Sequence, residues 1–371
     1  MRNSILWLLT ALSLSIDTAS AQKRKIARPF TQAGLRDGFP DGVTLEGGGR
    51  FASLVKTASV QVEGSNEVFD LRYRIFAPVD QFLKSSGVKG AAASEADCDR
   101  SRNGINIVLH GDSADSWVDF PNKKGFKANF DGQRTRFFGA AVLAPNDRPI
   151  WGGDFIGGGK EDRKDCIPHM DALSQLIRTN MANDTCFDTQ KTTFMTISGG
   201  SNVFTNCFMP RHLETFPKMA AVVGCGAVPP RDGLFTKASE EALATARIHF
   251  QSTQNEAKGF QVTLPQAIAK YSELGLQSAN QSALDELQTF DNTPAGGHCE
   301  FDGRSFKTGS DVLVASIPQI LFKGEAVNGF VPQPFSQVGT LQFARDQQPR
   351  SQLGRRKRRA RRAQSTPTVI G

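Results

Sequence analysis

The chain has 371 residues, a length that suits one large domain with extensions and a sizeable hydrophobic core. Its net charge of +7 is matched by the seven Lys and Arg residues between Arg355 and Arg362, so the rest of the chain is neutral and no general affinity for nucleic acid is expected. Beyond the N-terminal segment, no apolar run reaches the roughly 18 residues of a membrane-spanning helix.

The first 21 residues have the layout of a secretory signal peptide. Arg2 supplies the charged start, Ile5 to Ile16 form the apolar core, and Ala19 to Ala21 give a small-residue cleavage site. We therefore predict a secreted, extracellular protein. Residues 22–50 are rich in Gly and basic residues with little periodicity, which indicates a linker or N-terminal arm.

The cysteines are even in number, and in a secreted chain this favours disulfide bonds. None has the spacing of a zinc site, and the pairing stays open, because six cysteines allow 15 connectivities. They are Cys98, Cys166, Cys186, Cys207, Cys225 and Cys299. Two sequons, at Asn183 and Asn280, are consistent with glycosylation in a secretory route.

Short apolar strands alternate with amphipathic helices along the chain. A hairpin with one buried face is predicted over 59–62 and 68–76. Further strands are predicted at 105–109, 137–143, 194–197, 219–223, 246–250 and 287–290, and helices at 169–181, 204–209, 240–246, 264–274 and 310–322. This order predicts an α/β fold: a mostly parallel sheet, helices on both faces, and an antiparallel N-terminal hairpin at the edge.

The domain boundaries follow from this pattern. Residues 51–325 are predicted to form the folded domain, residues 326–354 a C-terminal extension, and residues 355–371 a basic disordered tail. Contact of the tail with acidic polymers, or its cleavage by a secretory-pathway protease, is the alternative to a tail without function. Nuclear targeting is at odds with the signal peptide.

The stretch from Thr196 to Val203 is predicted as a strand–turn–helix with a serine at its apex. This is the layout of a nucleophile elbow, in which a strained turn lifts the serine hydroxyl clear of the sheet. Aligned on Ser201, the G-x-S-x-G pattern is met at four positions, and Val203 departs from it. Ser201 is the predicted nucleophile; the alternative is a structural Gly-Gly-Ser turn.

A base and an acid follow later strands in the order Ser, acid, His, which is the chain order of α/β-hydrolase triads. His298 is the predicted base, because an imidazole can take up and release a proton near neutral pH. Glu256 is the predicted acid, and Asp291 is a poorer choice because it lies at the wrong strand end. The oxyanion hole is expected to be formed by the backbone N–H of Asn202 and one N–H from the loop His110 to Ser113, where Asp112 and Ser113 are the candidate residues.

Two tryptophans, Trp117 and Trp151, are candidates to line a substrate groove, with core packing as the alternative. No metal site is predicted, because the aspartates at 112, 115 and 119 lack the spacing of a calcium loop. No cofactor is expected.

Three motifs carry a resemblance to a known superfamily: Val108 to Asp112, Ser198 to Ser201, and Gly296 to His298. With them the chain resembles secreted fungal α/β-hydrolases of the polysaccharide-esterase and depolymerase-like group. The resemblance implies ester hydrolysis without a metal or organic cofactor. Some tannase- and feruloyl-esterase-like proteins pair a cysteine beside the serine with one after the histidine; Cys299 fits the second position, and Gly200 stands at the first.

The sequence therefore predicts a secreted serine esterase acting on wall-polysaccharide or small esters. The alternative is a secreted α/β-hydrolase-like binding protein without catalysis. That alternative rests on Val203 at the elbow, on Asn255 at the position where an acid is expected, and on the basic tail.

Overall fold

The computed structural model describes residues 31–91, 99–121, 137–153, 163–217, 219–301 and 332–344, together with residues 309, 312 and 316. The predicted signal peptide, most of the predicted helix over 310–322, Cys98 and the basic tail lie outside the described residues. In the described parts of the chain, no helix has both the length and the apolar character needed to cross a membrane.

A single mixed sheet forms the centre of the described structure. Its strands lie in the order β1-β2-β3-β5-β4-β6-β7-β8-β9-β10. The six central strands, in the order β5-β4-β6-β7-β8-β9, run parallel to one another. At one edge β1, β2 and β3 pair antiparallel with each other and β3 pairs antiparallel with β5; at the other edge β10 pairs antiparallel with β9. The bounds are β1 (Gly42–Glu46), β2 (Phe51–Gln61), β3 (Val68–Pro78), β4 (Gly104–Leu109), β5 (Phe137–Leu143), β6 (Thr192–Ile197), β7 (Ala220–Gly224), β8 (Arg247–Gln251), β9 (Gln288–Asp291) and β10 (Gln333–Pro334).

Most of the described helices lie in the connections between the parallel strands, and the first lies ahead of β1. They are α1 (Gln32–Gly38), α2 (Asp115–Val118), α4 (Cys166–Leu176), α5 (Ala182–Asp184), α6 (Gly199–Val203), α7 (Met209–His212), α8 (Lys237–Leu243), α9 (Lys258–Gly275) and α10 (Gln281–Leu287). Two π-helical segments, Ile177–Met181 and Phe204–Phe208, join α4 to α5 and α6 to α7. Short 3₁₀ turns are Val79–Gln81, Lys84–Ser86, Arg100–Arg102, Leu213–Thr215 and Phe335–Thr340.

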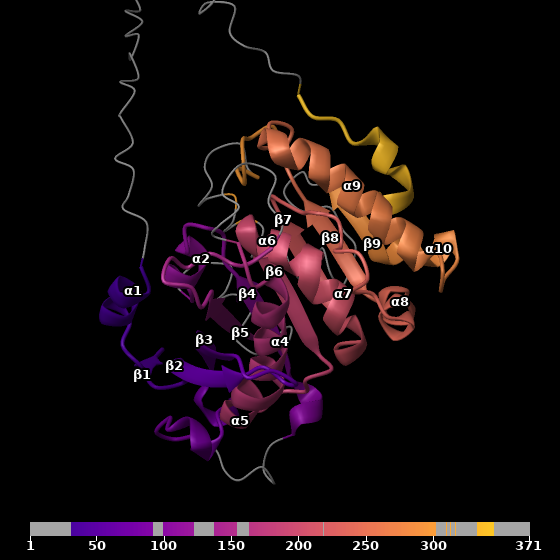
Figure 1. The fold of residues 1–371 in the computed structure, drawn as a ribbon. Coiled ribbons are helices and arrows are strands. Elements are labelled where there is room, and N and C mark those ends of the chain that lie inside the picture. The colour runs from indigo at the N-terminus through magenta and orange to yellow at the C-terminus, as the bar shows by residue number, and fades with distance from the viewer. Residues whose placement is uncertain are drawn as a thin grey trace, which may run out of the picture.

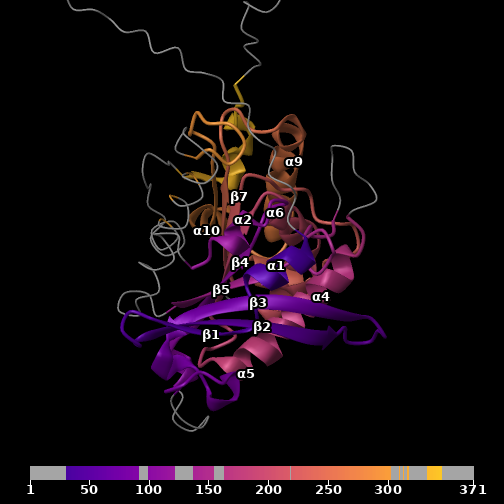
Figure 2. The same cartoon turned by 90° about the vertical axis from the view of Figure 1, so that its left-hand side faces the viewer.

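The hydrophobic core lies on both faces of the sheet, because side chains alternate along each strand. In β6, Phe194 joins a large cluster with residues of α4, α7, α8 and α9. Met195 and Ile197 of the same strand belong to a second cluster with Leu35 of α1 and Trp117 of α2. Figure 1 shows α4, α7 and α9 in front of the strands, and Figure 2 shows α4 and α9 together on one side of β4 and β7. The central strands are therefore buried on both faces.

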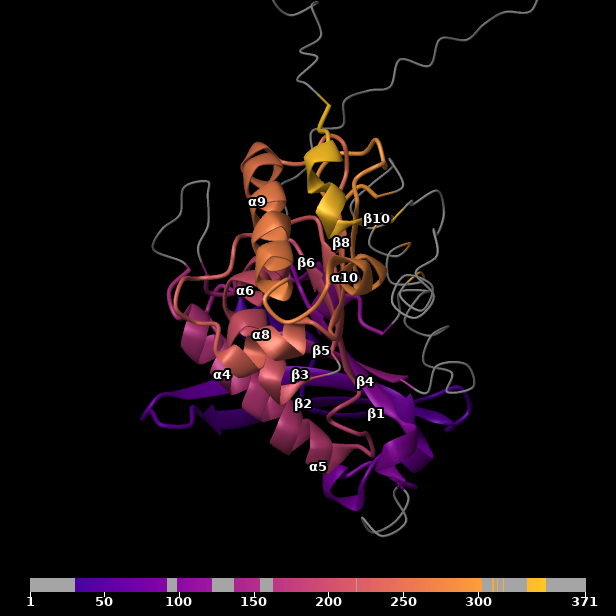
Figure 3. The ribbon, with the colours of Figure 1, turned by 90° about the vertical axis from the view of Figure 1, so that its right-hand side faces the viewer.

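Both predicted extensions contribute to the fold. Within residues 31–50, which belong to the expected N-terminal arm, lie α1 and the edge strand β1. At the other end, β10 pairs with β9, and Phe335 packs against Phe250 with ring centroids 5.3 Å apart. Figure 3 shows this C-terminal segment running beside α9.

The predicted α/β-hydrolase-like fold class is confirmed: a mostly parallel sheet with helices on both faces and an antiparallel hairpin, β2–β3, next to its edge. One boundary matters for function. The helix expected at 204–209 begins five residues earlier, at Gly199, directly after β6. The apex of the turn therefore lies before Gly199.

Candidate active site

The turn between β6 and α6 has Ser198 at its apex. Ser198 has φ 50° and ψ −111°, a backbone conformation that residues with a side chain rarely adopt. It is flanked by Ile197, the last residue of β6, and Gly199, the first residue of α6. Centred on Ser198, the elbow reads Thr196-Ile197-Ser198-Gly199-Gly200, with Thr at the first glycine position and Gly at the last.

Close backbone contacts explain the two glycines of this elbow. A Cβ on Gly200 would lie 2.5 Å from the carbonyl oxygen of Leu109, at the end of β4. A Cβ on Gly199 would collide with the carboxylate of Asp112. The turn can therefore approach the neighbouring strand only because residues 199 and 200 have no side chain.

Ser198, His298 and Glu256 are joined in one hydrogen-bonded chain. The Ser198 Oγ lies 2.9 Å from His298 Nε2, and His298 Nδ1 contacts Glu256 Oε1. A carboxylate beside Nδ1 fixes the tautomer with the proton on Nδ1, so the lone pair of Nε2 can accept the Ser198 hydroxyl proton. The three side chains follow β6, β9 and β8, which end at the same edge of the sheet.

Glu256 is buried and held in place by its own hydrogen bonds. Its side chain has 0% exposure, against 33% for that of His298. The N–H of Ala257 donates to Oε1 at 2.8 Å, and the hydroxyl of Ser252 donates to Oε2 at 3.1 Å. These two donors leave the carboxylate pointed at the imidazole.

The imidazole of His298 is positioned by a ring contact and a disulfide. Phe260, in the first turn of α9, stacks on it with centroids 5.4 Å apart and planes 15° apart. The next residue, Cys299, is disulfide-bonded to Cys225 after β7, with Cα atoms 5.0 Å apart. Cys225 and Cys299 both have positive φ, as Ser198 does. Three residues with an unfavourable backbone conformation therefore lie at this site.

Ser201, the predicted nucleophile, lies away from this chain of hydrogen bonds. It is fully buried, and its hydroxyl donates to the carbonyl of Gly224 at 2.8 Å and contacts Thr196 Oγ1 at 3.0 Å. The physical reason is its place on α6, three residues after the apex, where the side chain faces the ends of β6 and β7. The geometry corrects the candidate nucleophile to Ser198.

The expected oxyanion donor Asn202 is corrected for the same reason, because its N–H donates to Ser198 O at 3.0 Å within the helix. Gly199, in contrast, opens α6, and its N–H has no intrahelical acceptor. Gly111 lies against the elbow: a Cβ on it would be 3.2 Å from the Cβ of Ser198. The backbone of Asp112 follows directly, whereas Ser113 lies one residue further along the exposed loop.

His110 fixes this loop. Its Nδ1 lies 2.6 Å from the carbonyl of Gly111, and the N–H of Ala144 donates to its Nε2 at 3.0 Å. Burial lowers the pKa of His110 to about 4, so the ring is neutral at pH 7, with the proton on Nδ1. His110 therefore holds the loop after β4 in place and takes no part in the proposed proton transfer.

The two tryptophans expected in a substrate groove are core residues. Trp117 and Trp151 each have 0% exposure. Trp117 packs beneath the guanidinium of Arg74, which lies 5.4 Å from the ring centroid, and Trp151 packs against His110 at 5.4 Å. Trp117 belongs to the core cluster on one face of the sheet and Trp151 to the cluster on the other face. The prediction that these two side chains line a substrate groove is therefore corrected.

The expected disulfides are confirmed for two pairs, Cys166–Cys207 and Cys225–Cys299, and Cys186 is disulfide-bonded as well. Cys225, His298 and Cys299 bring their ligand atoms within 4.8 Å of one another. The disulfide engages both sulfur atoms, so this group does not offer thiolates to a metal ion.

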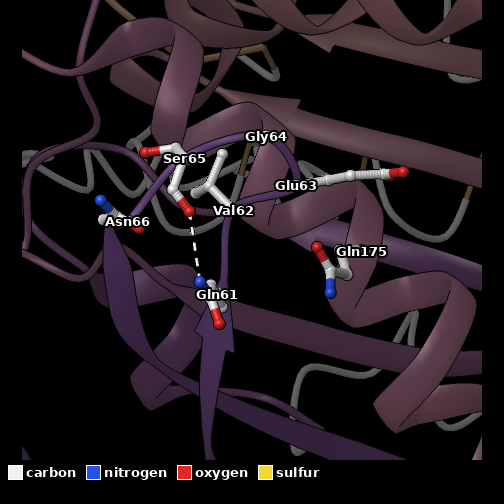
Figure 4. Close-up of a pocket in the computed structure, with 7 residues that line it drawn as sticks. All are labelled: Gln61, Val62, Glu63, Gly64, Ser65, Asn66 and Gln175. Atoms are coloured by element: carbon white, nitrogen blue, oxygen red, sulfur yellow. Dashed lines mark hydrogen bonds between the residues drawn. The ribbon is translucent and has the colours of Figure 1, made fainter.

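Two cavities on the described surface lie apart from Ser198. One, of about 400 Å³, lies between the β2–β3 turn and Gln175 of α4, as Figure 4 shows. The other, of about 460 Å³, includes Phe137 and Lys191 near the start of β5 and β6. Neither is lined by Ser198, His298 or Glu256.

No protein-family model and no curated protein sequence matches this chain. Among solved structures, it is similar to a thermostable esterase, with 14% identity over 60% of this chain and a TM-score of 0.37; the match spans 52% of that protein. It is similar to a ferulic acid esterase, with 13% identity over 72% of this chain and 98% of the other, at a TM-score of 0.41. A glucuronoyl esterase from Solibacter usitatus has 10% identity over 72% of this chain and 84% of its own, at a TM-score of 0.37.

Proposed function

We propose that this protein is a serine hydrolase that cleaves carboxylic esters through Ser198, His298 and Glu256. The observation that carries the proposal is the 2.9 Å contact between Ser198 Oγ and His298 Nε2, at a strained turn between a strand and a helix. A hydroxyl becomes a useful nucleophile only when a base can take its proton, and this contact provides the base.

The proposed reaction has two halves. Ser198 Oγ attacks the ester carbonyl while His298 Nε2 takes its proton, and the buried carboxylate of Glu256 stabilises the imidazolium. The proton then passes to the leaving alkoxide, and an acyl group remains on Ser198. Water, deprotonated by His298, hydrolyses the acyl-serine, which releases the acid and restores the hydroxyl.

The proposed oxyanion hole is formed by two backbone N–H groups. One belongs to Gly199, the residue after the nucleophile, and the other to Asp112, in the loop after β4. Donors fixed by the backbone stabilise the charge that develops on the carbonyl oxygen, and loss of one such donor costs about 100- to 1000-fold in rate.

Extracellular esters of wall polysaccharides or of small alcohols are the proposed substrates. This part of the proposal rests on the N-terminal segment of residues 1–21, whose charged start, apolar core and cleavage site predict secretion. Two departures had supported a binding protein without catalysis. Val203 is buried within α6 and Asn255 bonds to the carbonyl of Ala295, so neither belongs to the candidate triad.

Ser198 and Ser201 offer a matched test. We expect a fluorophosphonate to label the wild-type protein and Ser201→Ala at comparable rates, and not to label Ser198→Ala. Hydrolysis of p-nitrophenyl acetate should follow the same pattern, with Ser198→Ala at least about 1000-fold slower. Labelling that survives Ser198→Ala and disappears in Ser201→Ala would return the nucleophile to Ser201. A wild-type protein that neither reacts nor hydrolyses esters would reject the proposed function.

A further inference from the structure

An ion pair between Arg163 and Asp112 lies against Gly199, the residue that follows Ser198. The guanidinium of Arg163 contacts the carboxylate of Asp112, with side-chain exposures of 7% and 39%. A Cβ on Gly199 would meet Asp112 Oδ1 and would lie 3.3 Å from Arg163 Nη1. Both charges therefore lie against the backbone whose N–H is proposed to bind the oxyanion.

Packed backbone holds Arg163 in this place. Its Nη1 donates to the carbonyl of Trp151 at 3.3 Å, and its own carbonyl accepts from the N–H of Gly153 at 3.0 Å. Three residues later, Cys166 is disulfide-bonded to Cys207 on the helical segment that continues α6. The elbow helix and the Arg163 backbone are thus fastened to each other.

The charge of Asp112 poses a problem for ester hydrolysis at Ser198. Negative charge develops on the carbonyl oxygen as the tetrahedral intermediate forms, next to the N–H of Gly199. An unpaired carboxylate against the same residue would repel that charge, and it would also repel the alkoxide that leaves. A guanidinium in contact with the carboxylate cancels this repulsion at short range.

We propose that Arg163 is a positioning residue for this reaction, which acts through Asp112. It neutralises the carboxylate beside Gly199 and keeps the Asp112 backbone in line with the oxyanion. This inference rests on the proposed function of Ser198. It adds a residue from the segment after β5, which the chain order of the triad does not indicate.

A charge-compensation experiment tests the proposal. Arg163→Met keeps the apolar part of the side chain and removes the charge; we expect kcat for p-nitrophenyl acetate to fall about 100-fold, with KM changed less than about threefold. A trifluoromethyl ketone, which adds to a serine as an oxyanion, should bind correspondingly more weakly. The double variant Arg163→Met/Asp112→Asn should recover at least about tenfold of the lost kcat, because the uncompensated charge is gone.

Arg211→Met is the matched control. Arg211 also pairs with an aspartate, Asp171, but it lies 13 residues beyond Ser198 on the continuing helix, about 20 Å along its axis. Its kcat should equal that of the wild type. Arg163→Lys, which keeps the positive charge, should retain activity within about tenfold of the wild type.

Two results would overturn the inference. One is a folded Arg163→Met with wild-type kcat; the other is a double variant no faster than Arg163→Met, which would indicate a purely structural role. If Arg163→Met does not fold, the test falls to Arg163→Lys. A folded Arg163→Lys whose kcat is about 100-fold or more below that of the wild type would also overturn the inference. These outcomes differ from failure of the proposed function, in which the wild type itself is not labelled at Ser198 and hydrolyses no ester.

Discussion

Replacing Glu256 by Gln tests how the acid of the candidate triad works. The amide has nearly the same shape as the carboxylate but no charge. Because the N–H of Ala257 donates to Oε1 at 2.8 Å, the oxygen of the amide is favoured at that position and can still accept from His298 Nδ1. The NH₂ group then faces the hydroxyl of Ser252, which can accept from it. The imidazole should therefore keep its tautomer, and only the electrostatic contribution should be lost.

The size of this contribution follows from the burial of the pair. A unit charge on the carboxylate and one on the imidazolium, about 4 Å apart at an effective dielectric constant of about 20, attract each other by roughly 4 kcal/mol. At about 1.4 kcal/mol for each factor of ten, this predicts a loss of about 1000-fold in kcat for Glu256→Gln. Glu256→Ala also releases the imidazole, so we expect a further loss, to about 10,000-fold.

The assay is steady-state hydrolysis of p-nitrophenyl acetate at pH 7.5, with the folded fraction of each variant measured by circular dichroism. Asp291→Asn is the matched control. Asp291 is as buried as Glu256, but it accepts hydrogen bonds from the Thr293 N–H and the Gln251 amide instead of His298. It should stay within about threefold of the wild type. An Asp291→Asn variant slower than Glu256→Gln would refute the reasoning and make Asp291 the acid.

Three further outcomes are expected. Burial lowers the pKa of His110 from 6.5 to about 4, so as the pH falls the unfolded chain binds a proton at this residue before the folded chain does. The free energy of unfolding should therefore drop by roughly 3 kcal/mol between pH 6.5 and pH 4. Urea denaturation at the two pH values should show a smaller drop for His110→Gln than for the wild type. Replacing both Cys225 and Cys299 by Ser frees the His298 loop and should lower kcat about tenfold in protein that is still folded. Ser198→Gly should raise the free energy of unfolding by about 1 kcal/mol relative to Ser198→Ala, because relief of about 1–3 kcal/mol of backbone strain exceeds the entropy cost of glycine; equal stabilities would contradict strain at the elbow.

The fold could be predicted from hydrophobic patterns because each central strand is a short apolar run between turn residues. The edge elements could not. Strand β1 is exposed along most of its length, so it lacks the alternation that identifies a half-buried strand, and α1 offers a single buried side chain, Leu35. His298 and Glu256 could be found because parallel strands end at one edge of a sheet. Arg163 could not, because it stands in a charged stretch with no periodicity, and only the folded backbone brings it to Gly199.

The elbow itself shows why the G-x-S-x-G pattern alone does not separate Ser198 from Ser201. Centred on Ser201, the motif lacks its last glycine; centred on Ser198, it lacks its first, so the two frames score equally. The two glycine positions are not equivalent in space. At the last one, Gly200, a Cβ would lie 2.5 Å from Leu109 O, whereas the first is occupied by Thr196, whose hydroxyl finds a partner in Ser201. A departure at the crowded position should therefore weigh more than one at the other, and by that physical criterion the folded backbone favours Ser198 as the centre of the elbow.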